Sequence, residues 1–203
     1  MELIPGTAVY DVIILGSSQV GKTSIAWRYV NEEFLIDPIP TRGVEFLTKM
    51  IPEPHLRVRL TISVTGGNER YADILFIRRR VYGALLVYDI HDRRSYEVAK
   101  AWAAKLKAKL SPWIVLALVG HKVDVLENRV VSTEEAAQFA KENGLIFLEA
   151  SAQEDINITK CFLDIAIKIR QRDVADRLQK CYNERITNQG CKSHGFLWFK
   201  KNK

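Results

Sequence analysis

Alternating apolar and polar positions in the first third of the chain predict a strand, a helix and then a pair of strands. The apolar run at 9–15 is typical of a buried strand, and the spacing at 24–30 is that of an amphipathic helix. Apolar residues at the even positions of 58–64 alternate with Arg, Thr and Ser, which is the period-two pattern of a half-buried strand. A further strand at 44–51 is followed by Pro-Glu-Pro-His at 52–55, so we expect these two strands to pair antiparallel around a turn.

Strand and helix patterns alternate regularly in the rest of the chain. The predicted elements are a strand at 83–89, a helix at 95–109, a strand at 113–120, a helix at 133–143, a strand at 146–150 and a helix from 157 to about 180. Such alternation requires right-handed crossovers, so we expect an α/β fold with a mostly parallel six-stranded sheet, one antiparallel strand and helices on both faces. Ligands of such sheets bind at the carboxyl ends of the strands, where the loops at 16–23, 65–70, 120–124 and 150–152 converge.

The first of these loops, Gly16-Ser17-Ser18-Gln19-Val20-Gly21-Lys22-Thr23, carries the candidate chemistry. Its glycines allow the backbone to turn N–H groups toward a phosphate, Lys22 can reach the outer phosphates, and Thr23 can offer its hydroxyl to Mg²⁺. An incidental glycine-rich turn is the alternative, but the strand before the loop and the helix after it favour phosphate binding. The sequence therefore predicts a P-loop NTPase fold.

Composition suggests one globular domain in a cytoplasmic protein. The chain has 203 residues, of which 47% are hydrophobic, and we expect an N-terminal extension at 1–7, a domain at 8–180 and a flexible basic tail at 181–203. No apolar run approaches the roughly 18 to 20 residues of a membrane span. Three cysteines are too few and too widely spaced for a disulfide framework or a structural zinc site, and Cys161 is expected to be a helix-core thiol.

The net charge of +6 is concentrated near the C-terminus, where residues 168–203 hold ten Lys or Arg against three acids. This region is either simply solvated or attracts anionic lipid or nucleic acid, and no nucleic-acid-binding motif accompanies it. We expect 190–201 to be disordered, with a Phe-Leu-Trp-Phe cluster next to lysines that could make peripheral contact with a membrane or a protein.

Six motifs occur in an order that is typical of one protein family. They are Gly-Ser-Ser-Gln-Val-Gly-Lys-Thr-Ser at 16–24, Thr-x-Gly-Val-Glu-Phe at 41–46, Gly-x-Glu-Arg-Tyr at 67–71, Val-Tyr-Asp-Ile at 87–90, Gly-x-Lys-x-Asp at 120–124 and Glu-x-Ser-Ala at 149–152. Over roughly residues 8 to 172, the chain resembles a Ras-like small GTPase of the Rab branch, most closely its early-endosomal group. The resemblance implies a guanine-nucleotide-binding switch of vesicle-mediated transport, which binds GTP or GDP with Mg²⁺, hydrolyses GTP to GDP and phosphate, and contacts protein effectors and exchange factors. It also implies a peripheral position on endosomal or vesicle membranes.

The same resemblance assigns the residues of the nucleotide site. They are Gly16, Ser17, Ser18, Gln19, Val20, Gly21, Lys22, Thr23, Ser24, Phe34, Thr41, Gly67, His121, Lys122, Asp124, Ser151, Ala152 and Gln153. In this assignment Thr23 and Thr41 hold Mg²⁺, and Thr41 also closes over the γ-phosphate. Gly67 donates its backbone N–H to that phosphate and is a catalytic position together with Asn68.

The residues assigned to the base end are Phe34, which stacks on the base, and Lys122 and Asp124. Lys122 packs along the base, and the Asp124 carboxylate accepts two hydrogen bonds from the guanine N1–H and amino groups, a pair of donors that adenine lacks. Ser151 and Ala152 support Asp124. Without the resemblance, Asp124 would be interpreted equally well as a surface acid before a turn, and Phe34 as a core aromatic residue.

The departures from the family are concentrated in the chemistry. Where the family has Asp-x-Ala-Gly-Gln, this chain has Val64-Thr65-Gly66-Gly67-Asn68. The family aspartate holds Mg²⁺ through water and the glutamine orients the attacking water, so we expect a weakened Mg²⁺ site at Val64 and weak GTP hydrolysis. Asn68 is a degenerate water-orienting residue, because its amide is one methylene shorter than that of glutamine.

Other departures affect the base motif and the surface that effectors contact. His121 stands in place of the family asparagine and Gln153 in place of a lysine, and an imidazole donates or accepts in a different geometry from an amide. Phe46 is kept, but Ser63 replaces a tryptophan. The Arg triplet at 78–80 is either a solvated helix end or a docking patch. The chain ends without the paired cysteines that carry prenyl groups, so no C-terminal lipid anchor is expected.

Two other functions are compatible with parts of this pattern. A pseudo-GTPase scaffold would use the fold to bind proteins without cycling between nucleotides. A P-loop phosphotransferase that uses ATP would need an Arg-bearing lid and has no use for Asp124 after Lys122, which counts against it.

Overall fold

The computed structural model describes residues 7–36, 41, 43–51, 53, 56–66, 80–109 and 114–195, with side chains as far as Glu184. The strands are β1 (Ala8–Leu15), β2 (Val44–Met50), β3 (Val58–Thr65), β4 (Val81–Asp89), β5 (Val115–His121) and β6 (Ile146–Ala150). The helices are α1 (Lys22–Asn31), α3 (Arg93–Lys109), α4 (Thr133–Glu142) and α5 (Ile158–Gly195). Most of the predicted turn at 52–55, and the Arg triplet at 78–80 except for Arg80, lie outside the described residues.

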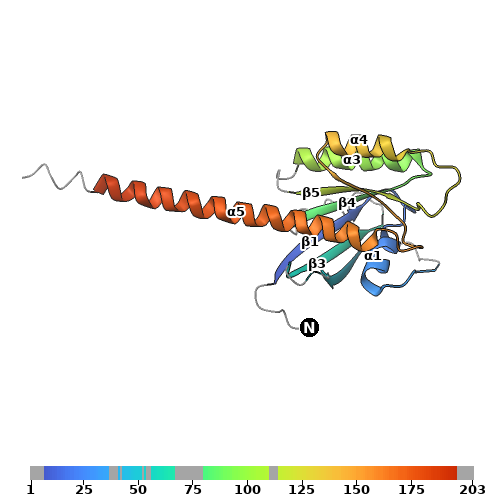
Figure 1. Cartoon of the computed structure of the whole chain (residues 1–203), viewed down its shortest axis with the longest axis horizontal. Helices are drawn as coiled ribbons and strands as arrows, with labels where there is room; N and C mark the ends of the chain where they lie inside the picture. The colour runs from blue at the N-terminus through green and yellow to red at the C-terminus, as the bar shows by residue number, and fades with distance from the viewer. Residues whose placement is uncertain are drawn as a thin grey trace, which may run out of the picture. The chain divides into compact units, whose positions relative to one another are not determined.

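The six strands form one sheet in the order β2-β3-β1-β4-β5-β6 (Figure 1). β2 runs antiparallel to β3, and every other neighbouring pair is parallel. The predicted α/β fold with one antiparallel strand is therefore confirmed. Because the parallel strands point the same way, the segments that follow β1, β4, β5 and β6 leave the sheet at one edge.

The sheet is covered on both faces, because its central strands bury side chains alternately on each side. In β1, Val12 and Ile14 belong to a core cluster that includes residues of α1 and of the first part of α5. Ile13 and Leu15 belong to a second cluster with residues of α3 and α4. Figure 1 shows α3 and α4 together on one face of the sheet, with α1 on the other.

β3 is more buried than its alternating sequence predicts. Val58, Leu60, Ile62 and Val64 are fully buried, as expected for the core face of the strand. On the opposite face, Ser63 and Thr65 are also buried near the carboxyl end of the strand. The half-buried pattern therefore holds for the first part of β3 and is lost where the strand approaches the ligand edge. The prediction that Val64 keeps the apolar phase is confirmed.

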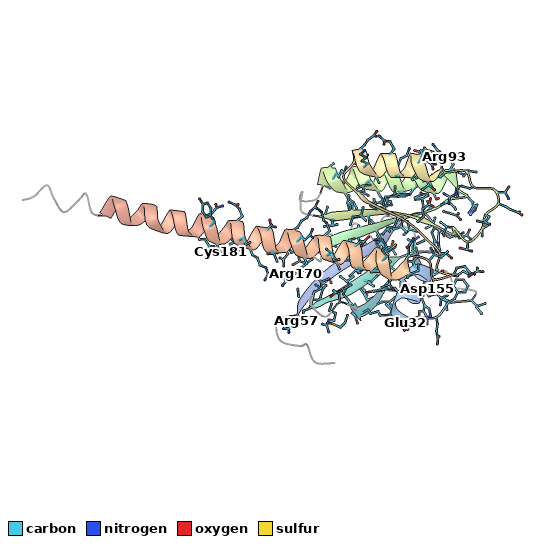
Figure 2. The ribbon with its side chains drawn as sticks, in the orientation of Figure 1. Glu32, Arg57, Arg93, Asp155, Arg170 and Cys181 are labelled. Atoms are coloured by element: carbon cyan, nitrogen blue, oxygen red, sulfur yellow. The ribbon has the colours of Figure 1, made fainter. Side chains whose placement is uncertain are left out.

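The helices α3 and α4 are joined at their N-terminal ends by an ion pair. Arg93, the first residue of α3, donates from Nη2 to Glu135 Oε1 at 2.6 Å in the first turn of α4. Figure 2 labels Arg93 at this end of α3, beside α4. Ser132 caps α4 by accepting a hydrogen bond from the Glu135 N–H at 3.1 Å, which satisfies one of the unpaired donors of the first turn.

Helix α5 is longer than the sequence predicts. The helical pattern places its end near Lys180, and this boundary is wrong, because the helix continues to Gly195. The segment after 170 contains no proline and no glycine before Gly190, and Asp173 accepts from Arg177 Nη2 at 3.0 Å across one helical turn. The compact units of the chain are Met1–Ile169 and Arg170–Lys203, and α5 contributes to both. The limits 1–7, 8–180 and 181–203 stay predictions.

In the first unit, α5 provides a buried face. Cys161 lies on this face, as predicted, and burial raises the pKa of its thiol to about 12. Phe162 is fully buried and stacks on Tyr29 of α1, with ring centroids 4.0 Å apart and an angle of 15° between the planes. Within the described ranges, no helix combines the length and the apolar character that crossing a membrane requires.

The stack of Phe162 on Tyr29 leads to a stability prediction. Phe162→Ala should lower the free energy of unfolding by about 3 to 5 kcal/mol, because it leaves a cavity between α1 and α5. Phe162→Leu fills most of that space and should cost clearly less. Urea unfolding followed by circular dichroism measures both, with Leu178→Ala on the exposed part of α5 as the control. Equal losses for Phe162→Ala and Leu178→Ala would contradict the prediction.

Candidate functional site

The loop between β1 and α1 needs glycine at both ends for different reasons. Gly16 has φ 145°, and a Cβ on it would lie 2.1 Å from the Val87 carbonyl oxygen of the neighbouring strand β4. Gly21 has φ 92°, and a Cβ on it would lie 2.3 Å from the ring of His121. Other residues would therefore be strained in backbone conformation and would collide with β4 or with His121. The backbone of this loop can then wrap closely around a bound group.

Lys22 is a buried cation next to this loop. Its Nζ donates hydrogen bonds to the carbonyl oxygens of Gly16 at 3.1 Å and Ser17 at 2.5 Å. Burial lowers the pKa of Lys22 to about 8, and no carboxylate pairs with it in the part of the chain that the structure describes. A bound phosphate would supply the missing negative charge, so the burial of Lys22 fits a site for phosphate groups.

The hydroxyl groups of Thr23 and Thr41 meet beside Lys22. Their Oγ1 atoms are 2.8 Å apart. Two oxygens at adjacent corners of an octahedron with metal–oxygen distances of about 2.05 Å lie about 2.9 Å apart, so this pair fits neighbouring ligands of Mg²⁺. Gly66 supports Thr41, since a Cβ on Gly66 would lie 2.1 Å from the Thr41 carbonyl oxygen. The threonine at 41 therefore depends on a glycine at 66 for its position.

The base end of the site is formed by the segment after β5. Lys122 has φ 69°, and its Nζ lies 2.6 Å from Oδ2 of Asp89. Burial works to raise the pKa of Asp89, but hydrogen bonds from Lys122 and His91 outweigh it and hold this pKa below its usual value. Asp124 lines the same cavity, and no hydrogen bond to its carboxylate occurs within the described ranges. The Asp124 carboxylate can thus accept hydrogen bonds from a bound base, next to the ion pair between Lys122 and Asp89.

The loop after β6 is held on two sides. His121 Nδ1 donates to the Val20 carbonyl oxygen at 2.7 Å, and its Nε2 accepts from the Ala152 N–H at 3.1 Å. From α1, Arg28 Nε donates to the Ala152 carbonyl oxygen at 2.7 Å, and its Nη2 donates to the Gln153 carbonyl oxygen at 2.6 Å. The peptide groups on both sides of Ala152 are therefore fixed by side chains from other elements.

These parts surround one cavity of about 440 Å³. The predicted site residues that line it are Ser18, Gln19, Gly21, Lys22, Thr23, Ser24, Phe34, Thr41, His121, Lys122, Asp124 and Gln153. Gly16, Ser17, Val20, Ser151 and Ala152 are not in the lining, and Gly16, Ser17, Val20 and Ala152 support it through the hydrogen bonds described above. Gly67 and Asn68, the predicted catalytic positions, lie outside the described residues.

Some site residues were not among those predicted from the sequence. Thr65, Gly66 and Val125 also line the cavity, and Arg28 holds the loop after β6. Thr65 ends β3, and both Thr65 and Gly66 belong to the loop at 65–70 that the sequence predicts at the ligand edge. Val125 directly follows Asp124, so the positions of these residues in the sequence could have identified them. The role of Arg28 has no such signal, because its partners lie 124 and 125 residues away in the sequence.

Comparison with known proteins identifies this arrangement, since residues 11–171 match the model of the Ras family. The chain belongs to the Ras family of small GTPases. Ras-related protein Rab11D of Nicotiana tabacum is 39% identical to it over 162 residues, which cover 79% of this chain and 73% of that protein. Ras-related protein Rab-5A of Dictyostelium discoideum is 38% identical over 161 residues, or 79% and 80% of the two chains. GTP-binding protein ypt3 of Schizosaccharomyces pombe is 38% identical over 162 residues, or 79% and 76%. The chain is a member of the Rab branch.

Ras-family proteins bind GTP or GDP with Mg²⁺, and the residues of this cavity fit both. The buried Lys22 ammonium suits the phosphates, and the paired hydroxyls of Thr23 and Thr41 suit the metal ion. The family aspartate is absent, since the sequence has Val64 at its position, and this side chain is fully buried. Among the described residues that line the cavity, Asp124 at the base end is the only one with a carboxylate.

Lys22→Met should separate nucleotide binding from stability. Loss of the charge should weaken GDP binding roughly hundredfold or more, because the phosphates would lose the charge-assisted hydrogen bonds that the Lys22 ammonium can donate to them. In nucleotide-free protein, the variant should be no less stable at pH 7, since the buried cation is gone. Isothermal titration with GDP measures the first effect and urea unfolding the second.

The parent protein supplies the pH control for this experiment. The pKa of Lys22 is about 8 in the folded state and 10.5 ordinarily, so the unfolded chain binds more protons in this interval. The stability of the parent should therefore rise with pH between these values, and Lys22→Met should lack that rise. Lys160→Met, which removes an exposed cation of α5, should behave like the parent. A Lys22→Met variant that binds GDP as tightly as the parent would contradict the phosphate role.

Asp124→Asn tests which base the site reads. The amide cannot accept both hydrogen bonds from guanine, and each charge-assisted bond contributes about 1.5 to 3 kcal/mol, so GDP affinity should fall tenfold or more. Binding of ADP should change much less, because adenine does not offer the same pair of donors. Competition of both nucleotides against a fluorescent GDP analogue measures the ratio. An equal loss for both would show that Asp124 does not read the base.

Proposed function

We propose that this chain is a Rab-like guanine-nucleotide switch of vesicle traffic in which GTP hydrolysis is weak. The observation that carries the proposal is the position of Val64. This side chain is fully buried in the core cluster beneath α1, at the position where the family places the aspartate that holds Mg²⁺ through water. The switch framework is thus retained while a charge near the metal is missing.

The weaker metal site follows from the groups that remain. Thr23 and Thr41 offer neutral hydroxyl oxygens, so the protein brings no negative charge to this end of the cavity within its described lining. Mg²⁺ would then depend on the phosphate oxygens for charge compensation. A metal held less firmly stabilises the developing charge of the transition state less well, which slows hydrolysis.

Asn68 adds a second reason for slow hydrolysis. It replaces the family glutamine that orients the attacking water, and its amide is one methylene shorter. A displacement on the scale of one ångström is enough to reduce the reaction of a positioned water. Asn68 lies outside the described residues, so this part of the proposal rests on the sequence alone.

The contact between Thr23 and Thr41 supports a switching role. Thr41 lies in the segment between α1 and β2. Its hydroxyl reaches Thr23 in the first turn of α1, beside the loop at 16–23, which we call the phosphate loop. In the proposed cycle, triphosphate and Mg²⁺ order this segment and hydrolysis releases it. Effectors and exchange factors would then distinguish the two states. The proposed location is the surface of endosomal or other transport vesicles, with peripheral attachment.

The surface for effectors differs from that of the family at one cross-strand pair. Phe46 of β2 stands opposite Ser63 of β3, where the family has a tryptophan. Phe46 is half exposed and Ser63 is buried, so a small polar side chain stands opposite Phe46 where the family has a large aromatic one. We propose that the effectors of this protein differ from those of typical Rab proteins. A place in the early-endosomal group stays a proposal, since the Rab11D and Rab-5A relatives are almost equally similar.

A pseudo-GTPase scaffold is the second candidate, and the support of Thr41 by Gly66 favours it. Gly66 lies so near the Thr41 carbonyl oxygen that a Cβ on it would come within 2.1 Å, and such close packing would favour one conformation of the segment without cycling. The nucleotide content of purified protein distinguishes the two functions. A switch should carry GDP or GTP in near-stoichiometric amount, whereas a scaffold should carry none.

Restoring both family residues should raise hydrolysis. Val64→Asp returns the charge near the metal, and Asn68→Gln returns the reach toward the attacking water, so the double variant should hydrolyse GTP at least about tenfold faster. Neither change alone should suffice. Single-turnover hydrolysis of labelled GTP measures the parent, both single variants and the double variant.

The matched control is Val64→Asn combined with Asn68→Gln, which has the same shape without the charge. Both substitutions at 64 should lower stability, because they bury a polar group, and Mg²⁺ with nucleotide should recover part of this loss only for aspartate. A parent that already hydrolyses GTP as fast as the double variant would overturn the proposal that hydrolysis is weak.

A further inference from the structure

We propose that His121 is a positioning residue that links the phosphate loop to the base loop only while its ring is neutral, so that acid pH speeds nucleotide release. Here the base loop is residues 151–153. The inference rests on the proposed nucleotide switch and concerns how this chain retains its ligand. It starts from the replacement of the family asparagine by an imidazole at the end of β5.

The two ring nitrogens have fixed and opposite roles. Nδ1 faces the carbonyl oxygen of Val20 at 2.7 Å, and a carbonyl can only accept, so Nδ1 carries the proton. Nε2 faces the backbone N–H of Ala152 at 3.1 Å, and an N–H can only donate, so Nε2 carries a lone pair. The arrangement therefore requires the neutral Nδ1–H tautomer. In this form the ring satisfies one polar group on each loop.

The ring has little room to change these partners. Only 5% of His121 is exposed, and the ring packs directly against Gly21, where a Cβ would come within 2.3 Å of it. Water therefore cannot easily replace Val20 or Ala152 as a partner. A rotation of the ring would bring it against the backbone of the phosphate loop. The contact with Gly21 thus couples the ring to the residue that precedes Lys22 and Thr23.

A second proton on the ring would break the link to the base loop. With Nε2 protonated, an N–H of the ring would point at the N–H of Ala152, and two donors cannot bond to one another. Arg28 would still donate to the carbonyl oxygen of Ala152, so the base loop would keep its hydrogen bonds to Arg28 and lose the one to His121. The neighbouring Gln153 lines the cavity, so a shift of this loop changes the base end of the site.

Charged groups on the surrounding elements act on the ring in both directions. Burial lowers the pKa of His121, and Lys122 on the same segment adds to this; the Val20 carbonyl, Asp124 and Asp89 of β4 act to raise it. Lys22 on the phosphate loop and Arg28 of α1 are the other cations near the two loops that the ring joins. The net result is a pKa below the ordinary value of His, which keeps the ring neutral at pH 7.

The sign of the pH effect follows from this direction. Because the folded protein binds the proton less readily than an open state in which His121 meets water, the open state gains protons first as the pH falls below about 6.5. The closed arrangement is therefore fully stabilised above that pH and loses stability below it. An asparagine at this position would donate and accept through an amide that does not titrate, so the pH dependence belongs to this chain's histidine.

The test measures how fast the protein releases a fluorescent GDP analogue into excess unlabelled GDP and Mg²⁺ between about pH 5.5 and pH 7.5. In the parent the rate should rise about tenfold toward the acid end, as expected for the loss of one buried hydrogen bond. In His121→Asn the rate should stay almost constant. His91→Asn is the matched control, because it makes the same substitution at a histidine that contacts Asp89 and Val125 and does not join the two loops. It should keep the pH profile of the parent.

The outcomes distinguish this inference from the proposed function. A parent that retains the GDP analogue at pH 7.5 but shows the same release rate at all pH values overturns the role of His121, as does a His121→Asn variant that keeps the acid effect. A parent that does not bind the analogue at pH 7.5 overturns the nucleotide switch itself. Nitrogen NMR of labelled histidine gives an independent measurement that needs no variant. It should show a neutral Nδ1–H ring at pH 7, and a doubly protonated ring would contradict the proposal.

Discussion

The parallel pairing of β1, β4, β5 and β6 is the constraint on which the whole site depends. Because these strands end at one edge of the sheet, the phosphate loop, the segment around Lys122 and the base loop converge, although the base loop follows the phosphate loop by more than a hundred residues. The sheet positions only the ends of these loops. Their precise placement then comes from a few side chains that reach across the gaps, chiefly His121 and Arg28.

Much of the fold and of the phosphate end followed from the sequence because the signals are local. The strand, glycine loop and helix around Lys22 are contiguous, and the alternation of strands and helices fixes the sheet type. The end of α5 was missed because the exposed segment after 170 has no strong stop signal before Gly190, and its helix is supported by side-chain pairs such as Arg177 with Asp173.

The role of His121 shows why the base end was harder to predict. The sequence shows that an imidazole replaces an amide and that the two groups differ in hydrogen-bond geometry. The residues next to His121 in the sequence do not show which groups its ring contacts. The structure brings Val20 from one loop and Ala152 from another to opposite sides of the ring, so that one donor and one acceptor suffice. Such complementarity is a tertiary property. Val64 is the contrasting case, since the apolar phase of β3 predicted its burial directly.

Helix α1 has a consequence for the ligands that this site can accept. Its first residues, Lys22 and Thr23, belong to the phosphate end, and Arg28 of the same helix holds the carbonyl groups of the base loop. Six residues of an α-helix span about 9 Å, and this length barely changes with temperature or solvent. The helix therefore fixes the distance between the two ends of the cavity. A ligand whose base and phosphates are spaced differently from those of a nucleotide cannot bind at both ends at once.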